Sequence, residues 1–485
     1  MGTLYDRLKK YRDSDYYGFH MPGHKRVFRP AEDLPYGLDI TEIEGFDDLH
    51  HAQGILKEAQ ERAAEVFGAQ ETHFLVNGST AGILSALLGS TDRGDTVLVA
   101  RNCHKSVYHA IEMQGLIPVY LYPEFDPEAW LNAGISAEDV REALERHPQA
   151  KAVVIVSPTY DGVVSDVAAI AETVHEKGLP LIVDEAHGAH FGFHPYFPAS
   201  SNSQGADIVI HSLHKTLPSL TQTALLHMNG QIADRGRVRE YLHMLQTSSP
   251  SYVLMASMDL CVELLRERGD RLFAAYTERL ETLREGLKGL KILKTAETVS
   301  YDRSKIVVSV KDAGMSGSEL AEVLRKEYHL QMEMAAGTYV LAMTSAGDTQ
   351  EGFDRLWRAL LEIDRRLCEK TGTEDGRRWE KALPGIQKAP AGKFPRLEMV
   401  YTCAKMKELR RKGAAGGTLK TLPLGESVGA VAAEYAYLYP PGTPLVVPGE
   451  RMTEEAAEAL LMYQRLGFSI EGLHTQESIE VWLDG

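Results

Sequence analysis

Along residues 72–210, the pattern of apolar and polar positions predicts short strands that alternate with helices. The expected strands are apolar and rich in β-branched residues, and they cover residues 72–76, 97–100, 119–122, 152–156, 179–183 and 206–210. Between them, apolar positions at helical spacing predict helices at 83–88, 106–114, 137–145 and 167–177. Apolar strands that alternate with helices are typical of a largely parallel sheet covered on both faces. The pattern therefore predicts an α/β fold.

The same reading extends toward both ends of the chain. Residues 1–15 predict a short amphipathic helix, and apolar positions from Gly54 predict a second helix that Gly68 ends. Strands at 304–310 and 339–343, with helices at 318–328 and 352–368, predict a small α/β domain. Residues 370–393 are polar and punctuated by Gly and Pro, which indicates a linker.

Composition narrows the class of protein. A chain of 485 residues with 44% hydrophobic and 25% charged residues is ordinary for a soluble protein of more than one domain. The net charge of −16 argues against a nucleic-acid footprint and against an anionic membrane as partners. The four cysteines are far apart, and neither a secretion signal nor a stretch of membrane-spanning length is present. We therefore expect a cytoplasmic protein without a disulfide framework.

Candidate chemistry gathers where the expected strands end. The groups are the Gly78-Ser79-Thr80 loop, His104, Asp184, and Ser212 with Lys215. Ligands of parallel α/β sheets bind beyond the carboxyl ends of the strands. The coincidence of these groups at that edge predicts one ligand site.

Each group also has an ordinary alternative. Lys215, expected in a loop, is either a nucleophile whose pKa falls in a partly dry site or a solvated lysine. Ser79 and Thr80 either bind a phosphate at a helix N-terminus or cap that helix. His104 either stacks on a planar ring or caps a helix. Asp184 ends an apolar strand, where a carboxylate needs a partner such as a metal, a histidine or a protonated ring nitrogen.

Pyridoxal phosphate accounts for these groups together. Lys215 would form the Schiff base, Asp184 would pair with the ring nitrogen, and His104 would stack on the ring. The phosphate would be held by Ser79, Thr80 and Ser212. In this chemistry the cofactor is an electron sink. A metal is not expected, because the spacing of His187, His190 and His194 matches no zinc signature.

Two polar motifs precede this region. FHMPGHK at 19–25 places His20 and His24 beside a Pro-Gly turn, which either contacts a ligand or a partner subunit or is only a turn. GFDDLHH at 45–51 carries Asp47 and Asp48, which either cap the following helix or receive a substrate amine.

The chain resembles the Orn/Lys/Arg decarboxylases over nearly its whole length. These are pyridoxal-phosphate enzymes of fold type I with an aspartate-aminotransferase-like core. The motifs that carry the resemblance, in order, are FHMPGHK (19–25), EGFDDLHH (44–51), LVNGSTAG (75–82), RNCHKS (101–106), VDEAHGAH (183–190), HSLHKTLPSLTQ (211–222), QTSSPSY (246–252) and YPPGTPLVVPGE (439–450). The length resembles the short Gram-positive-type form, which lacks the N-terminal wing domain.

The resemblance implies a role for each matching residue. Lys215 is the Schiff-base lysine, and His214 contacts the phosphate or the reacting centre. The other implied cofactor contacts are Gly78, Ser79, Thr80, His104, Asp184, Ala186, His187 and Ser212. Thr247 and Ser248 match a segment that reaches the phosphate of the neighbouring subunit, which implies a homodimer with shared sites.

The implied activity is decarboxylation of a basic amino acid, as in polyamine biosynthesis. Arginine is favoured, giving agmatine and carbon dioxide, with lysine and ornithine as alternatives. Lys215 or His214 would give a proton to the α-carbon. The candidates for an acidic residue that meets the distal cation are Asp47, Asp48, Glu426 and Glu434. Ala430 stands where the family often has arginine, which leaves the substrate preference open.

Two other functions are compatible with parts of this sequence. An aminotransferase or other lyase on the same fold would need an arginine for the substrate carboxylate, and the sequence does not identify one. A non-catalytic binding protein would not need Lys215 or Asp184, and both are present.

The expected organisation has five parts. Residues 1–69 would pack on the partner subunit, and 70–293 would form the large cofactor domain. A small α/β domain (294–369), the linker (370–393) and a C-terminal decarboxylase domain (394–485) would follow.

Overall fold

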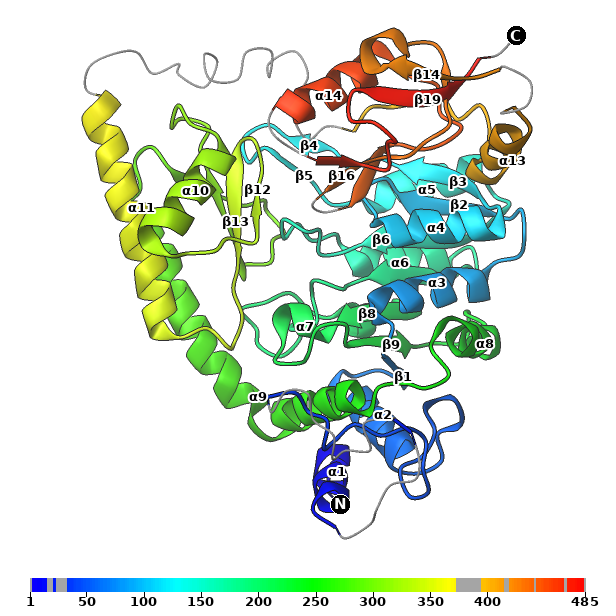
Figure 1. The fold of residues 1–485 in the computed structure, drawn as a ribbon, viewed down its shortest axis with the longest axis vertical. Coiled ribbons are helices and arrows are strands. Elements are labelled where there is room, and N and C mark those ends of the chain that lie inside the picture. Colours follow the sequence, from blue (N-terminus) through cyan, green and yellow to red (C-terminus); the bar gives the residue numbers. More distant parts are fainter. Residues whose placement is uncertain are drawn as a thin grey trace. The chain divides into compact units, whose positions relative to one another are not determined.

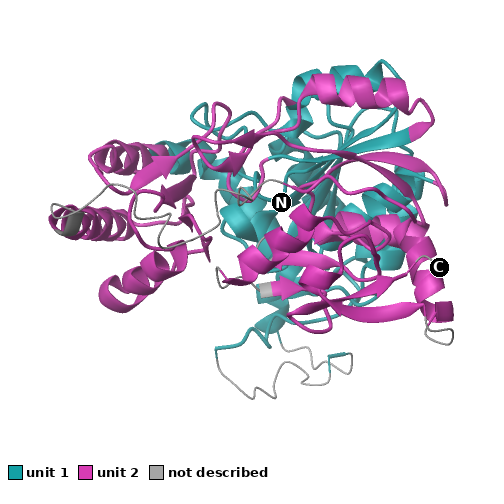
Figure 2. Ribbon diagram, turned by 90° about the horizontal axis from the view of Figure 1, so that it is seen from above, with its two compact units in different colours: residues 1–91, 151–157, 167–275 teal, residues 92–150, 158–166, 276–485 magenta. Residues whose placement is uncertain are grey.

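The computed structural model describes residues 2–14, 21–22, 33–371, 394–413, 418–439, 442–465 and 469–483. The motif at 19–25, except Met21 and Pro22, lies outside the described residues, and so does the expected linker from residue 372 onward. The chain forms two compact units, which Figure 2 colours separately. Unit 1 contains residues 1–91, 151–157 and 167–275, and unit 2 contains residues 92–150, 158–166 and 276–485.

Unit 1 contains a sheet whose strands follow the order β1 (Glu71–Leu75), β9 (Ala224–Met228), β8 (Ile208–Ser212), β7 (Leu181–Asp184) and β6 (Ala150–Val156) (Figure 1). The pairs β6–β7 and β7–β8 are parallel, whereas β9 is antiparallel to both β8 and β1. The expected α/β class with a mostly parallel sheet is confirmed. The reversed strand β9 was not predicted.

Helices of unit 1 include α1 (Leu4–Arg12), α2 (Ile55–Val66), α3 (Gly78–Ser90), α6 (Val167–His175), α8 (Arg235–Leu245) and the first part of α9 (Tyr252–Leu287), besides the short η1 (Leu49–His51) and η2 (Ser201–Ser203). Two glycines bring α3 close to its neighbours. A Cβ added at Gly82 would lie 2.6 Å from Leu75 Cδ1, and one at Gly89 would lie 2.7 Å from Val238 Cα. Because interiors are close-packed, the lack of a side chain at Gly82 lets α3 approach the sheet, and the lack of one at Gly89 lets it approach α8.

Unit 2 begins with the parallel strands β2 (Thr96–Ala100) and β3 (Ile117–Leu121) and with α4 (Lys105–Gln114) and α5 (Ala137–Arg146). A two-stranded sheet joins β4 (Phe125–Asp126) and β5 (Leu131–Asn132). A four-stranded sheet follows, in the order β10 (Lys294–Ala296), β11 (Lys305–Ser309), β13 (Tyr339–Met343) and β12 (Met334–Ala335), with α10 (Gly317–Tyr328) and α11 (Gln350–Thr371). Of these elements, β11, β13, α10 and α11 correspond to the strands and helices expected for the small α/β part, whereas β10 and β12 were not predicted.

The C-terminal part of unit 2 contains two three-stranded sheets. Their orders are β14 (Leu419–Pro423), β19 (Ser478–Trp482), β15 (Val431–Ala432), and β17 (Thr443–Val446), β16 (Ala436–Tyr439), β18 (Ser469–Glu471). The helices are α13 (Cys403–Gly413), α14 (Glu454–Arg465) and the short η3 (Leu424–Glu426). Pro440 and Pro441 of the YPPG turn lie outside the described residues.

Arg101 anchors this C-terminal part within unit 2. Its side chain is 0% exposed, and its guanidinium donates to Tyr108 Oη (2.9 Å), Pro444 O (2.8 Å), Leu445 O (3.1 Å) and Glu450 Oε2 (3.2 Å). Charge-assisted bonds of this kind are strong and directional. Arg101 therefore ties the end of β2 to the segment that carries β17.

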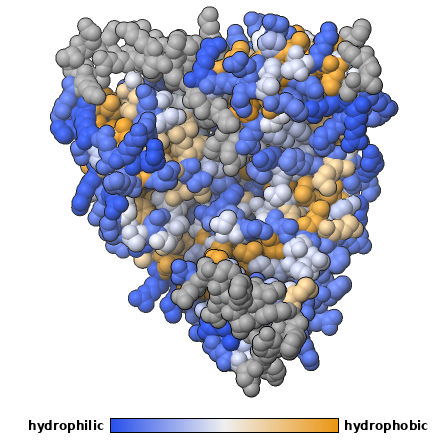
Figure 3. All heavy atoms as spheres, viewed as in Figure 1, coloured by the Kyte–Doolittle hydropathy of each residue, from blue (hydrophilic) through white to orange (hydrophobic). Residues whose placement is uncertain are grey.

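None of the described helices is apolar over enough of its length to cross a membrane. On the face shown in Figure 3, hydrophilic side chains predominate and hydrophobic ones form scattered patches.

Candidate active site

Lys215 lies directly beyond the carboxyl end of β8. It belongs to a single-turn helix, α7 (Leu213–Thr216), which corrects the expected loop. The backbone N–H of Leu217 donates to Leu213 O at 2.8 Å and closes this turn. The side chain is half-buried, and its Nζ lies 2.9 Å from His187 Nε2. The helical turn fixes the backbone at the predicted nucleophile.

Asp184 ends β7, the strand next to β8, and pairs in register with Ile210. It is 4% exposed, and its Oδ1 accepts the backbone N–H of Ala186 at 3.1 Å. Burial raises the pKa of this carboxyl group, while the positive charges of Lys215 and of His211 when protonated act to lower it. Within unit 1 the fold thus brings the predicted lysine and the predicted carboxylate into electrostatic contact.

The N-terminus of α3 lies at the same end of the sheet. Gly78 has φ = 73° and is the first residue of this helix, so the expected Gly78-Ser79-Thr80 loop is wrong: these residues form the first turn of α3. Ser212 Oγ donates to Ser79 Oγ at 3.0 Å. The N-cap residue Asn77 makes no side-chain cap hydrogen bond. N–H groups in the first turn of a helix point outward and favour an anion such as a phosphate.

Thr247 and Ser248 follow α8 and are exposed. The backbone N–H of Thr247 donates to Asn77 Oδ1 at 3.3 Å, and Thr247 O lies 2.8 Å from His50 Nε2. This segment is therefore placed beside the N-terminus of α3 in the same chain.

His214 is half-buried on α7, with its Nδ1 3.0 Å from Thr223 O. Burial lowers the pKa of this imidazole. A carbonyl accepts only, so Nδ1 carries the proton and Nε2 carries the lone pair in the neutral form. His214 is thus a base or, once protonated, an acid within two residues of Ser212 and one of Lys215.

The remaining predicted residues have visible structural tasks. His104, in unit 2, caps α4 by accepting the N–H of Ser106 at 3.2 Å, which confirms the capping alternative. Asp47 accepts the N–H groups of Gly54 (2.7 Å) and Leu56 (3.0 Å) at the start of α2, and Asp48 caps η1. Their roles toward a ring or a substrate stay predictions.

Glu434 and Glu426 belong to unit 2 and differ in environment. Glu434 is buried, accepts the N–H of Glu480 at 3.1 Å and lies 3.7 Å from Arg410. Glu426 is exposed on η3.

The histidines after Asp184 point to different neighbours. His187 contacts Lys215, the ring of His190 packs against Phe197, and His194 Nδ1 accepts the N–H of Tyr196. In the described part of the chain, no group of three or more His, Cys, Asp or Glu side chains is placed to hold a metal ion.

A hydrogen-bonded group next to Asp184 was missed from the sequence. Glu185 is 1% exposed and bonds to His211, which continues through His227 to Thr72. These residues come from four different strands or strand ends, so no local pattern could have revealed the group.

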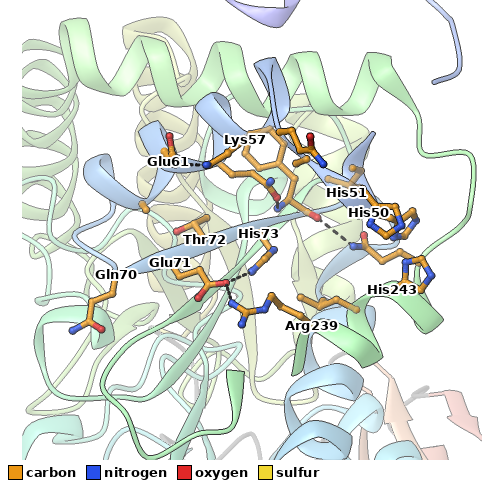
Figure 4. A pocket seen from close by; sticks show the side chains of 18 residues that line it. His50, His51, Lys57, Glu61, Gln70, Glu71, Thr72, His73, Arg239 and His243 are labelled. Carbon is orange, nitrogen blue, oxygen red and sulfur yellow. Dashed lines mark hydrogen bonds and ion pairs between the residues drawn. The ribbon is translucent and has the colours of Figure 1, made fainter. Parts of the chain in front are cut away.

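A cavity of about 530 Å³ lies beside the edge strand β1 (Figure 4). His50, His51 and His243 gather at one side of it, and Glu71 bonds to His73 (2.8 Å) and Arg239 (2.6 Å) at another. No residue predicted to contact the cofactor lines this cavity.

The geometry around Lys215 fits pyridoxal phosphate. A buried carboxylate at Asp184 suits the ring nitrogen, a half-buried amine at Lys215 suits the aldehyde, and the α3 N-terminus with Ser79 and Ser212 suits the phosphate. The fold and this site define a pyridoxal-phosphate enzyme of fold type I.

The chain belongs to the Orn/Lys/Arg decarboxylase family. Residues 2–311 match the major domain of that family and residues 386–474 match its C-terminal domain. This membership makes the chain an amino-acid decarboxylase that depends on pyridoxal phosphate.

Individual relatives agree with this membership. The arginine decarboxylase of Bacillus subtilis is 34% identical over 97% of this chain and 95% of its own length. The arginine decarboxylase of Halalkalibacterium halodurans is 33% identical over 94% of this chain and 91% of its own length. The crystal structure of the Francisella novicida lysine decarboxylase shares the fold, with a TM-score of 0.82 at 22% identity, covering 99% of this chain and 81% of that one.

Proposed function

We propose that this chain decarboxylates arginine and releases agmatine and carbon dioxide. The observation that carries the proposal is the 34% identity to the Bacillus subtilis arginine decarboxylase across nearly the full length of both chains. Lysine and ornithine are the alternative substrates, since lysine decarboxylases of other bacteria are also similar at 24–25% identity. The product amine would serve polyamine biosynthesis in the cytoplasm.

The side chains of unit 1 divide the work. When bound, pyridoxal phosphate withdraws electrons from the α-carbon of the substrate, so that the carboxylate can leave as carbon dioxide. Lys215 holds the cofactor and Asp184 presents a negative charge to its ring nitrogen. Ser79, Ser212 and the first turn of α3 receive the phosphate.

The reaction consumes one proton, which must reach the α-carbon from the protein. Lys215 and His214 are the two candidates, because both lie on α7 directly beyond β8. A group that gives a proton near neutral pH works best when its pKa lies near that pH. Burial lowers the pKa of His214 and so disfavours the protonated form that a donor needs, and we therefore assign the donor role to Lys215 and positioning to His214.

The distal cation of the substrate requires an acidic partner. Asp47 suits this role least among the four candidates, because its carboxylate already receives the N–H groups of Asp48, Gln53, Gly54 and Leu56. Glu434 already faces Arg410. Asp48 and Glu426 therefore come first for substitution.

We also propose a homodimer in which Thr247 and Ser248 approach the phosphate site of the neighbouring subunit. Their exposure after α8 supports this arrangement. Within the same chain, the backbone N–H of Thr247 donates to Asn77 Oδ1.

The test is a product assay on the purified, cofactor-loaded protein, with arginine, lysine and ornithine offered separately. We expect agmatine and carbon dioxide in equal amounts from arginine and much slower amine release from the other two. If cadaverine or putrescine is the main product, the substrate is lysine or ornithine instead of arginine. If the substrate is converted to a keto acid while an added amino acceptor is consumed, the reaction is transamination instead of decarboxylation.

A further inference from the structure

Two acidic residues occupy consecutive buried positions at the end of β7. Asp184 is 4% exposed and Glu185 is 1% exposed. A buried carboxylate without a compensating charge is unfavourable, and a second one nearby raises the pKa of the first. The proposed function uses Asp184 as an anion toward the cofactor and gives Glu185 no role. The surroundings of Glu185 therefore bear on the charge of Asp184.

Glu185 is held by donors from two directions. Its Oε1 lies 2.7 Å from His211 Nε2 and accepts Ser200 Oγ–H at 3.0 Å. Its Oε2 accepts the backbone N–H of Ser201 at 3.0 Å and the Ser201 hydroxyl. A carboxylate accepts only, so His211 Nε2 carries a proton. Both oxygens of Glu185 are thus held by hydrogen-bond donors beside Asp184.

The hydrogen bonds continue from His211 across the sheet. His211 Nδ1 lies 3.0 Å from His227 Nε2, and His227 Nδ1 lies 2.8 Å from Thr72 Oγ1. Both imidazoles are 0% exposed, and the Phe67 ring packs against them at 5.4 and 5.2 Å. The group runs over the neighbouring strands β7, β8, β9 and β1 and ends at Thr72, which lines the cavity in Figure 4.

Two proton arrangements satisfy every bond in this group. In the first, Thr72 donates to His227, His227 donates to a neutral His211, and His211 donates to Glu185. In the second, His211 is an imidazolium that donates to both Glu185 and His227, and His227 donates to Thr72. His227 is neutral in both, since burial holds its pKa well below the usual range. His211 can therefore take up one proton without losing a hydrogen bond.

We propose that His211 is a positioning residue for the cofactor: as an imidazolium it cancels the charge of Glu185, so that Asp184 stays ionised toward the ring nitrogen. Beyond Glu185 and His227, the charged groups that act on this corner are Asp184 and Lys215, and His73 acts on His227. The inference rests on the proposed role of Asp184. A neutral His211 would leave Glu185 uncompensated and weaken the hold on the cofactor.

The first test compares His211→Gln with His175→Gln. Glutamine keeps a donor toward Glu185 but takes up no proton. His175 is the matched control, because its Nε2 bonds to a buried carboxylate, Asp207 Oδ2, at the similar distance of 2.8 Å in the same unit. The measurement is the dissociation constant of pyridoxal phosphate, from its visible absorbance, across a range of pH.

We expect His211→Gln to weaken cofactor binding about tenfold at neutral pH, because Glu185 then lacks its counter-charge beside Asp184. The pH profile of the affinity should also differ between the wild type and the variant, because only the wild type has an imidazole beside Glu185 that can be protonated. His175→Gln should match the wild type at every pH. Affinity and pH profile unchanged in His211→Gln, while Asp184→Asn weakens binding, would overturn the inference and leave the proposed function standing.

A charge role also predicts rescue. The double variant His211→Gln with Glu185→Gln removes both members of the pair and should regain wild-type cofactor affinity, whereas a purely structural role gives no rescue. Where His211→Gln fails to fold, Glu185→Gln alone decides, because its pH profile of cofactor affinity should differ from that of the wild type. A wild-type pH profile in Glu185→Gln would refute the inference. Absence of cofactor binding by the wild type would instead refute the proposed function.

Discussion

Two clusters of opposite charges, one in each unit, differ in how many hydrogen bonds their charged groups make within the protein. In unit 2, the Arg101 guanidinium meets two backbone carbonyls, a phenol and Glu450, and it stacks 4.8 Å from the centre of the Tyr120 ring. In unit 1, Asp184 accepts one backbone N–H from Ala186, and Lys215 approaches His187 beside a helix N-terminus. Both clusters are built from charged side chains at the ends of β-strands.

The difference separates an anchor from a binding site. The Arg101 guanidinium donates hydrogen bonds to residues 444–450 and so joins two parts of unit 2 that are distant in the sequence. The Asp184 corner keeps acceptor capacity and a positive helix end directed to the edge of the sheet where ligands bind. Buried charge stabilises structure in the first cluster, whereas in the second we propose that it serves the cofactor.

Removing the nucleophile of the second cluster should have the largest effect. Lys215→Ala should lower kcat with arginine at least roughly a thousandfold, since it removes the residue that we propose holds the cofactor and moves a proton. Circular dichroism should show an unchanged fold. Lys407→Ala, which breaks a surface pair with Glu112, is the control and should keep its activity. Substantial activity in Lys215→Ala would contradict the assignment.

Breaking the first cluster should instead cost stability. Glu450→Ala leaves Arg101 buried without its counter-charge and should destabilise unit 2 by about 3–5 kcal/mol in chemical denaturation. Glu398→Ala removes the exposed partner of Arg451, 3.2 Å away, and should cost less than about 1 kcal/mol. If the two variants lose the same free energy of unfolding, Arg101 is not an anchor.

Asp184→Asn should separate binding from stability. Its pKa is raised by burial, so the cofactor-free protein is most stable where Asp184 is protonated and loses this contribution as pH rises. Asparagine should therefore leave the cofactor-free protein at least as stable at pH 8 as the wild type. Cofactor affinity should fall roughly tenfold or more. Thermal denaturation with and without pyridoxal phosphate measures both, and a large loss of stability without cofactor would contradict the account.

A smaller effect is expected at Glu71, which serves neither cluster. Burial acts to raise its pKa, but the bonds to His73 and Arg239 outweigh this and bring it to about 2. Its stabilisation is therefore present above pH 4.5 and is lost as pH falls toward 2. Glu71→Gln should cost roughly 1 kcal/mol at pH 7, and the difference should vanish in acid. A pH-independent difference would show that the charge is irrelevant.

The sequence predicted that Asp184 and Lys215 lie together, but it did not indicate the Arg101 anchor. Asp184 and Lys215 each follow an apolar strand, so the general rule for parallel sheets placed them together. Arg101 and Glu450 are 349 residues apart, and nothing local in either motif indicates that they meet. The same limit hid Glu185, His211 and His227, because their contacts depend on strand order.

Local elements were missed for a different reason. The sequence did not predict β9. Its apolar run follows β8 closely and could equally belong to a loop, and only the antiparallel pairing with β8 identifies it as a strand. The Lys215 segment was expected to be a loop because its one helical turn is too short to show periodicity. The long helix α9 and the short strands of the C-terminal sheets were also not predicted.

The most direct test of the account is to find which lysine holds the cofactor. Borohydride reduction of the loaded protein, followed by peptide mass mapping, fixes pyridoxal phosphate to that lysine. The account predicts the label on Lys215 alone, in the wild type and in Glu450→Gln, and no label in Lys215→Ala. A label on another lysine, such as the buried Lys305, would show that the cofactor site lies elsewhere.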